Sequence, residues 1–150
     1  MAWIRAMGAP AAAGLKIYDT GSWGIGYDNG VYSMGASFTV IGGITPSASS
    51  FDITSTGLGG NQCKSMVTAG IDLSQYSTLH VECNGIEQAL DVSSLTTTGY
   101  LCVFCYNYSG LYSTRVILAS QKTNFDSYSL GNIAIRTGAG TDTFTRIWLD

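Results

Sequence analysis

The feature that most constrains the fold is a polar turn that leads directly into a strand of alternating polarity, at residues 71–83 (IDLSQYSTLHVEC). Asp72 and Ser74 can each bond a nearby backbone N–H, and they therefore favour a tight, irregular turn. Tyr76 is placed to cover the end of an apolar core. In residues 79–83 the apolar side chains share one face and the polar side chains share the other. A strand with one face of each kind is typical of a β-sandwich.

Short strands separated by turn residues fill the rest of the chain, and no segment predicts a helix. Asn84-Gly85 predicts a tight hairpin turn, and Ser109-Gly110 predicts a second chain reversal. Many short strands at this spacing are typical of a sandwich or barrel. We therefore predict an all-β fold, an antiparallel β-sandwich of jelly-roll type at residues 15–150, with a short N-terminal arm at residues 1–14. The expected strands are Leu15–Tyr18, Val31–Val40, Ser50–Thr54, Cys63–Ala69, Thr78–Cys83, Ala89–Val92, Tyr100–Tyr108, Thr114–Ser120, Leu130–Arg136 and Thr143–Leu149.

The composition excludes several classes of function. Charged residues make up only 11% of the chain, against roughly a quarter in typical soluble domains. With a formal net charge of −3 and no basic stripe to meet phosphates, we expect no nucleic-acid partner. No apolar run is long enough to span a bilayer, so we expect no membrane insertion. Because charge keeps isolated proteins soluble, a surface this poor in charge favours a homo-oligomer or a larger assembly.

The N-terminal arm differs from everything after it. A secretory signal peptide needs a longer continuous apolar core, and Arg5 interrupts this one. Trp3, Ile4 and Met7 are apolar anchors on a segment too short to fold alone. Two interpretations stay open: a frayed terminus, or an arm that becomes ordered when it docks into a neighbouring subunit. In the second interpretation Trp3, Ile4, Arg5 and Met7 form the attachment segment.

The four cysteines allow a metal site, a disulfide or simple burial. Cys102 and Cys105 have the spacing of a metal-binding pair, but a strand places them on opposite faces, whereas zinc sites use this spacing on a turn. We therefore predict no metal site, and we interpret the cysteines as small buried hydrophobes. A disulfide such as Cys63–Cys83 stays open as an alternative, although it would be unusual in a reducing cytoplasm.

No pattern in the chain predicts catalysis or a cofactor. His80 is the only histidine, so a Ser-His-Asp arrangement would have to use it, and no nucleophile elbow is present. Glycoside hydrolysis needs two carboxyl groups with separated pKa values, and most aspartates here stand beside turn residues. A structural Ca²⁺ held by Asp142 with Asp19 or Asp28 is an alternative, but we interpret these aspartates as loop caps. The chain is expected not to be an enzyme.

Four passages resemble one family of proteins, in the same order and at similar spacing. The chain resembles the jelly-roll domains of phage and prophage minor structural and tail (fibre) proteins, which are themselves similar to carbohydrate-binding, galactose-binding-like sandwiches. This resemblance implies a virion component assembled in the host bacterial cytoplasm, often trimeric, with other virion proteins as partners and in some cases a host-surface polysaccharide as a ligand. The passages are residues 71–79 (IDLSQYSTL), 90–95 (LDVSSL), 100–103 (YLCV) and 147–149 (IWL).

Aromatic side chains are the strongest lead for binding, because sugars stack on flat rings that have polar neighbours. The hairpin around Ser109-Gly110 gathers three tyrosines and an asparagine, with Tyr106 and Tyr108 on one strand face and Tyr112 returning opposite them. The alternative is that these rings pack on an adjacent sheet or a sister subunit. We expect Trp148 to belong to the core or an interface. The glycan-binding candidates are Trp23, Tyr27, Tyr32, Tyr106, Asn107, Tyr108 and Tyr112.

These observations rank three candidate functions. The first is a bacteriophage virion protein, a fibre or decoration component of the tail or head that docks through its arm and contacts host-surface glycans. The second is a carbohydrate-binding module without a virion role. The third is a hydrolase of cell-wall glycan, which no motif in the sequence supports.

Overall fold

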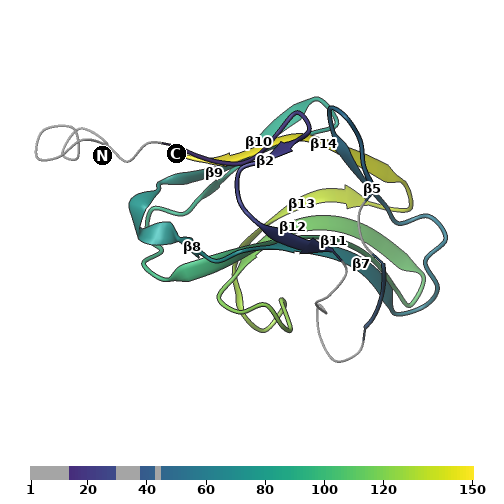
Figure 1. Cartoon of the computed structure of the whole chain (residues 1–150). Coiled ribbons are helices and arrows are strands. Elements are labelled where there is room, and N and C mark those ends of the chain that lie inside the picture. Colours follow the sequence, from purple (N-terminus) through teal and green to yellow (C-terminus); the bar gives the residue numbers. More distant parts are fainter. Residues whose placement is uncertain (1–13, 30–37, 43–44) are drawn as a thin grey trace, which may run out of the picture.

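Two twisted β-sheets pack face to face, with an apolar core between them (Figure 1). The structure, a computed structural model, describes residues 14–29, 38–42 and 45–150. Every strand pair in these ranges is antiparallel except β4 with β7, which is parallel. The predicted all-β antiparallel sandwich is therefore confirmed.

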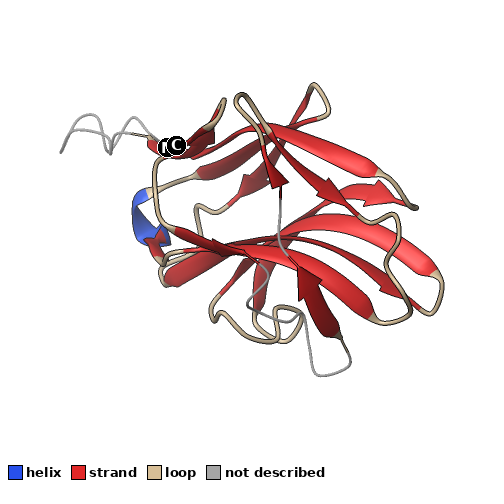
Figure 2. Cartoon of the chain, turned by 45° about the vertical axis from the view of Figure 1, so that its right-hand side comes forward, coloured by secondary structure: helices blue, strands red, loops and turns tan. Residues whose placement is uncertain are grey.

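Sheet A contains the start and the end of the described chain. In spatial order it consists of β10 (Ile86–Asp91), β9 (Thr78–Cys83), β14 (Thr141–Leu149), β1 (Leu15–Asp19) and β2 (Ser22–Trp23), with β6 (Phe51–Thr54) beside β14 and β5 (Thr45–Pro46) beside β6. Sheet B consists of β13 (Ser129–Thr137), β12 (Leu111–Ala119), β11 (Thr98–Tyr108), β7 (Gln62–Thr68) and β3 (Tyr27–Asn29), with β4 (Thr39–Gly42) beside β7 and β8 (Ile71–Asp72) beside β11. The helical element of the described chain is one 3₁₀ turn, η1 (Leu73–Gln75), at one end of the sandwich (Figure 2).

The predicted strands agree with the observed ones to within a few residues wherever the structure describes them. Both hairpin turns are confirmed, because Asn84 and Gly85 have φ of +54° and +75°, and Ser109 and Gly110 have +50° and +85°. These paired positive values are those of the two-residue turn that matches the twist of the flanking strands. Residues 31–37 of one expected strand lie outside the described residues. Four further strands, β2, β3, β5 and β8, were not predicted, because they are only two or three residues long.

The polar turn at residues 71–83 forms largely as expected. The Asp72 carboxylate accepts hydrogen bonds from the backbone N–H of Ser74 (3.1 Å) and from its hydroxyl (2.6 Å), so Ser74 donates to Asp72. These bonds stabilise the ionised form and lower the pKa of Asp72. Tyr76 packs against the core, as predicted. In β9 the apolar residues of the alternating pattern are buried.

The main core fills the space between the sheets and includes a set of stacked rings. Phe51 stacks on Phe144 with ring centroids 4.8 Å apart, and Tyr18 meets Phe51 edge-on at 4.8 Å. Strands from both sheets contribute to this core because alternate side chains point inward. Its fully buried large side chains include Ile17, Ile53, Met66, Leu73, Leu79, Leu101 and Leu118.

A second apolar cluster covers the outer face of sheet B. Phe125, from the loop at residues 120–128, has 0% exposure and packs there with Phe104 and Ile117. This loop explains why β11 is buried on both faces, as a run of apolar residues rather than a strict alternation. We call this set the outer cluster; its buried members are Cys63, Val67, Cys102, Phe104, Ile117, Ala119 and Phe125.

The four cysteines are buried and form no disulfide in the described residues. Cys102 lies in the outer cluster and Cys105 in the main core, so the prediction that they face opposite sides of one strand is confirmed. The alternative of a disulfide between Cys63 and Cys83 is wrong, because Cys63 belongs to the outer cluster and Cys83 to the main core. Burial raises the pKa of Cys83 and of Cys105 to about 12, which leaves them as unreactive thiols at neutral pH.

Asp142 is a buried anchor between two hairpins, and its interpretation as a loop cap is wrong. Its carboxylate is fully buried and accepts hydrogen bonds from Nε of Arg136 at 2.9 and 3.1 Å and from Nδ2 of Asn84 at 2.7 Å. Asn84 also accepts a bond from the backbone N–H of Thr143 at 2.9 Å. The β9–β10 turn is thereby fixed to β14. The guanidinium of Arg136 supplies the positive charge that balances this carboxylate.

Candidate functional site

The aromatic residues singled out from the sequence occupy separate places. Trp23 and Tyr27 stack on each other at 4.0 Å, and Trp23 also stacks on Phe51 at 5.3 Å. Both residues pack against the main core. They therefore extend the core rather than form an open platform.

The hairpin between β11 and β12 divides its four candidates between two faces. Tyr106 and Tyr108 share the outer face, as predicted, and Tyr108 is 47% exposed. Asn107 and Tyr112 are cross-strand partners on the inner face. Both donate to the carbonyl of Leu58, at 3.0 Å from Nδ2 of Asn107 and 3.2 Å from the hydroxyl of Tyr112. Grouping all four in one binding tip was therefore wrong, because two of them hold the preceding loop in place.

The two aromatic groups are also far apart. Tyr27 pairs with Thr68 at one end of β7, and Tyr106 pairs with Cys63 near the other end. Five residues of extended strand separate these positions, a distance of about 17 Å. Tyr32, Trp3, Ile4, Arg5 and Met7 lie outside the described residues. The structure therefore does not combine the predicted residues into one site.

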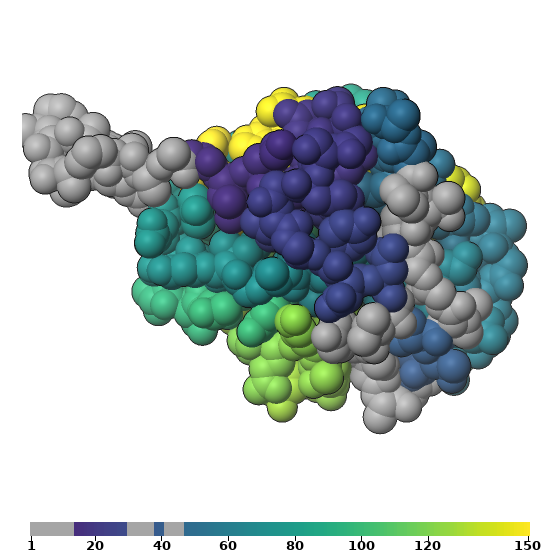
Figure 3. Space-filling view, viewed as in Figure 1, coloured from purple at the N-terminus to yellow at the C-terminus, as the bar shows by residue number. Residues whose placement is uncertain are grey.

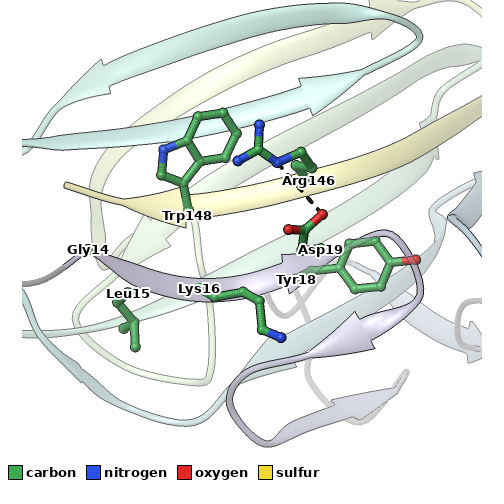
Figure 4. A pocket seen from close by; sticks show the side chains of 7 residues that line it. All are labelled: Gly14, Leu15, Lys16, Tyr18, Asp19, Arg146 and Trp148. Atoms are coloured by element: carbon green, nitrogen blue, oxygen red, sulfur yellow. Dashed lines mark ion pairs between the residues drawn. The ribbon is translucent and has the colours of Figure 1, made fainter.

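A hollow of about 210 Å³ lies between β1 and β14, on the outer face of sheet A (Figure 4). In Figure 3 the first strands, in purple, lie beside the last strand, in yellow. A register shift between Lys16 and Tyr18 creates this hollow. Ile17 and Tyr18 are both buried, so Lys16 and Asp19 are left on the outer face with two residues between them. The hollow is lined by Gly14, Leu15, Lys16, Tyr18, Asp19, Arg146 and Trp148.

Trp148 forms one wall of the hollow and lies outside both apolar clusters. Of the two expected places for Trp148, the core is therefore wrong, and an interface with another chain stays a prediction. Its neighbours Ile147 and Leu149 point inward instead. The imidazole of His80 stacks on the indole with centroids 4.6 Å apart and planes 6° apart. The guanidinium carbon of Arg146 lies 4.2 Å from the indole centroid. These contacts hold the indole in a fixed orientation.

Charged groups of both signs surround the hollow. Nε of Arg146 lies 3.7 Å from Oδ1 of Asp19, and Nζ of Lys16 donates to the hydroxyl of Ser22 at 3.2 Å. Next to Trp148, the Nδ1 atom of His80 lies 3.3 Å from Glu87. The hollow therefore offers hydrogen-bond donors, an acceptor and an apolar wall at one place.

The hollow was not predicted, because it lies on strands and the expected binding residues were mostly aromatic residues in turns. One signal in the sequence would have found part of it. In residues 146–149 (RIWL) the alternation places Arg146 and Trp148 on one face, opposite two apolar residues. The contribution of β1 carries no comparable signal, because it depends on the register shift at Lys16.

The structure holds two further observations on chemistry. Within residues 14–29, 38–42 and 45–150, no three His, Cys, Asp or Glu side chains are arranged to hold a metal ion. A helix long and apolar enough to cross a membrane is likewise not found in these ranges.

Comparison of the chain with protein-family models, curated proteins and solved structures found no match.

Proposed function

We propose that this chain is a structural and adhesive protein of a bacteriophage virion, a component of a tail or head fibre or a decoration protein. The observation that carries the proposal is the two-sheet antiparallel sandwich that the described residues form, the fold that the resemblance to phage structural proteins implies. A sandwich with a closed apolar core is a rigid support, and it leaves hairpins and outer faces free for contacts.

The proposed role is not enzymatic. Several carboxylates already have structural partners, as in the anchor of Asp142 with Arg136. Glu82 accepts a hydrogen bond from the hydroxyl of Thr145 at 2.7 Å. The Asp91 carboxylate accepts bonds from the backbone and hydroxyl of the residue two positions later. These contacts support a structural use of the carboxylates.

Attachment is assigned to residues 1–14. Trp3, Ile4 and Met7 supply apolar contacts and Arg5 a charged one, which suits docking into a neighbouring virion protein. The described chain begins at Gly14, whose neighbour Leu15 pairs with Leu149 in sheet A. The arm is therefore joined directly to β1 of sheet A.

The virion role is tested with particles from a bacterium that carries this gene within a prophage. Particles are induced, separated on a density gradient and analysed by mass spectrometry. We expect the chain to sediment with the particles, and a chain lacking residues 1–13 to stay in the soluble fraction. Absence of the full chain from intact particles would refute the virion role. Normal incorporation of the truncated chain would refute the assignment of the arm.

A homo-oligomer, with a trimer favoured, is part of the proposal. It is supported by the low charge of the chain and by the exposure of large apolar side chains, 71% for Leu111 and 62% for Ile86. Light scattering coupled to size-exclusion chromatography measures the mass in solution. A monomer at all concentrations would contradict this part of the proposal.

The second candidate is a carbohydrate-binding module without a virion role, and the hollow beside Trp148 is the observation that favours it. Both candidates include contact with a glycan. An array of bacterial polysaccharides, probed with the full chain and with Tyr108→Ala, tests that contact. Binding without particle association would favour the second candidate, whereas particle association without binding would favour a purely structural role.

A further inference from the structure

The two outer faces of the sandwich differ in how the chain itself covers them. Over sheet B, the loop at residues 120–128 inserts Phe125 into the outer cluster and closes that face. The described residues place no comparable loop over the outer face of sheet A. The hollow between β1 and β14 lies on this second face (Figure 4). It is therefore the better candidate for contact with an external ligand.

The groups in the hollow match hydroxyl groups better than they match a single ionic group. Lys16 and Arg146 are donors, and Asp19 is an acceptor. The hydroxyl groups of a sugar both donate and accept, so neighbouring hydroxyls can bond to Asp19 and Arg146 together. Trp148 lines the hollow and offers an apolar wall against which a sugar ring can pack.

The charge around the hollow disfavours an acidic ligand. Within the lining, Asp19 offsets one of the two cations, Lys16 and Arg146. Glu82 is the cross-strand partner of Arg146, and Glu87 contacts the His80 ring that stacks on Trp148. Like charges repel, so these carboxylates would weaken the binding of a phosphate or a uronic acid.

We propose that this hollow binds one neutral pyranose unit of a glycan, with Asp19 and Arg146 bonded to adjacent hydroxyls and Trp148 as an apolar wall. The inference rests on the proposed contact with a polysaccharide, and it adds where the contact lies and which class of sugar fits. The volume of about 210 Å³ is below the roughly 300–1,000 Å³ of pockets that enclose drug-sized ligands. One ring therefore occupies the hollow, and the rest of the glycan lies across sheet A.

The contacts of Trp148 favour binding because they are present before the ligand arrives. His80 stacks on the indole and the guanidinium of Arg146 lies over it, so little side-chain freedom remains to be lost. A shallow site for one ring gives weak affinity, with a dissociation constant of roughly 1 mM. Several copies in one oligomer would raise the apparent affinity through multivalency.

The test is an NMR titration of the full chain, labelled with ¹⁵N, against methyl glycosides of glucose, galactose and mannose. The chain has three tryptophans, so three indole N–H signals are expected, and Trp148→Phe assigns one of them. We expect that signal to shift and saturate with at least one glycoside. Asp19→Ala should weaken binding about tenfold, the loss typical of a charged hydrogen bond. Asp19 lies at the surface, and the amide spectrum of the variant shows whether it is folded.

Tyr128→Ala is the matched control, because it removes an exposed ring from the loop over sheet B and should leave binding unchanged. Saturating shifts around Tyr106 and Tyr108 in place of Trp148 would overturn the assignment of the hollow, while glycan contact would stand. Tighter binding of methyl glucuronide than of methyl glucoside would overturn the neutral class. No saturating shift with any glycoside would overturn the inference as a whole. The virion role is tested on particles, so its failure is separate from these results.

Discussion

Replacing Asp142 with asparagine tests whether the buried anchor between the two hairpins stabilises the fold. Asp142→Asn keeps the size of the side chain and removes its charge. In the native chain the carboxylate accepts from Arg136 at 2.9 and 3.1 Å and from Asn84 at 2.7 Å. An asparagine amide has one oxygen and two N–H donors. It can therefore satisfy only part of this arrangement.

The expected loss follows from the exposure of each partner. Removing one member of a fully buried ion pair costs about 3–5 kcal/mol. The side chain of Arg136 is 35% exposed, so water recovers part of its solvation, and we assign about 1 kcal/mol to the lost charge pairing. An asparagine with its oxygen at the Oδ1 position keeps the bond from Asn84, but its NH₂ group then faces Nε of Arg136, and this contact between two donors costs about 1–3 kcal/mol. The free energy of unfolding should therefore fall by about 3 kcal/mol.

Urea denaturation followed by circular dichroism measures this change, with the midpoint shifting at an unchanged slope. For a chain of this length, about 3 kcal/mol lowers the melting temperature by roughly 6–12 °C. Asp126→Asn, an exposed loop position, is the matched control and should change stability by less than about 0.5 kcal/mol. Asp142→Asn within that same limit would refute the reasoning. So would a double-mutant cycle with Arg136→Met that gives no coupling.

Three further predictions follow from the fold. The native thiols should not react with an aromatic disulfide reagent at pH 8, because burial raises the pKa of Cys83 and Cys105 to about 12. All four thiols should react in urea, and fast labelling of the native chain would contradict their buried placement. Gly85→Ala should lower the free energy of unfolding by about 1 kcal/mol, because φ is +75° there. The control is Gly60→Ala, where an added Cβ also meets open space. Equal effects of the two substitutions would rule out backbone strain as the cause. Hydrogen bonds to the Asp91 carboxylate lower its pKa from 3.8. The stabilising contribution of Asp91 is therefore present above pH 3.8 and is lost as pH falls through the lowered pKa. The stability difference between Asp91→Asn and the native chain should shrink below pH 3.8, and a constant difference would contradict this linkage.

Local patterns in the sequence predicted most strands and both hairpin turns. The alternation in β9 reports which residues face the core, because side chains in a strand alternate strictly. The pair Asn84-Gly85 predicts a turn by itself, because few residues adopt positive φ without strain. The same alternation placed Cys102 and Cys105 on opposite faces. Each of these predictions needs only neighbours a few residues apart.

The candidate site could not be predicted in the same way. The grouping of Tyr106, Asn107, Tyr108 and Tyr112 followed from closeness in sequence, yet pairing of Asn107 with Tyr112 turns both toward Leu58. Asp142 looked like a loop residue, yet the β9–β10 turn and Arg136 enclose it. Leu58 and Asn84 are tens of residues away from the side chains that they contact, so no local pattern contains these pairs.

The sequence by itself determined an all-β chain, the positions of its longer strands and the sites of its tight turns, since strand alternation and turn dihedrals are properties of neighbouring residues. Only the tertiary structure decided which face of each sheet is open. The loop at residues 120–128 closes sheet B, and the register shift at Lys16 shapes the hollow beside Trp148. The reason is that a surface is formed by strands distant in sequence, and their register is set by packing of the whole core.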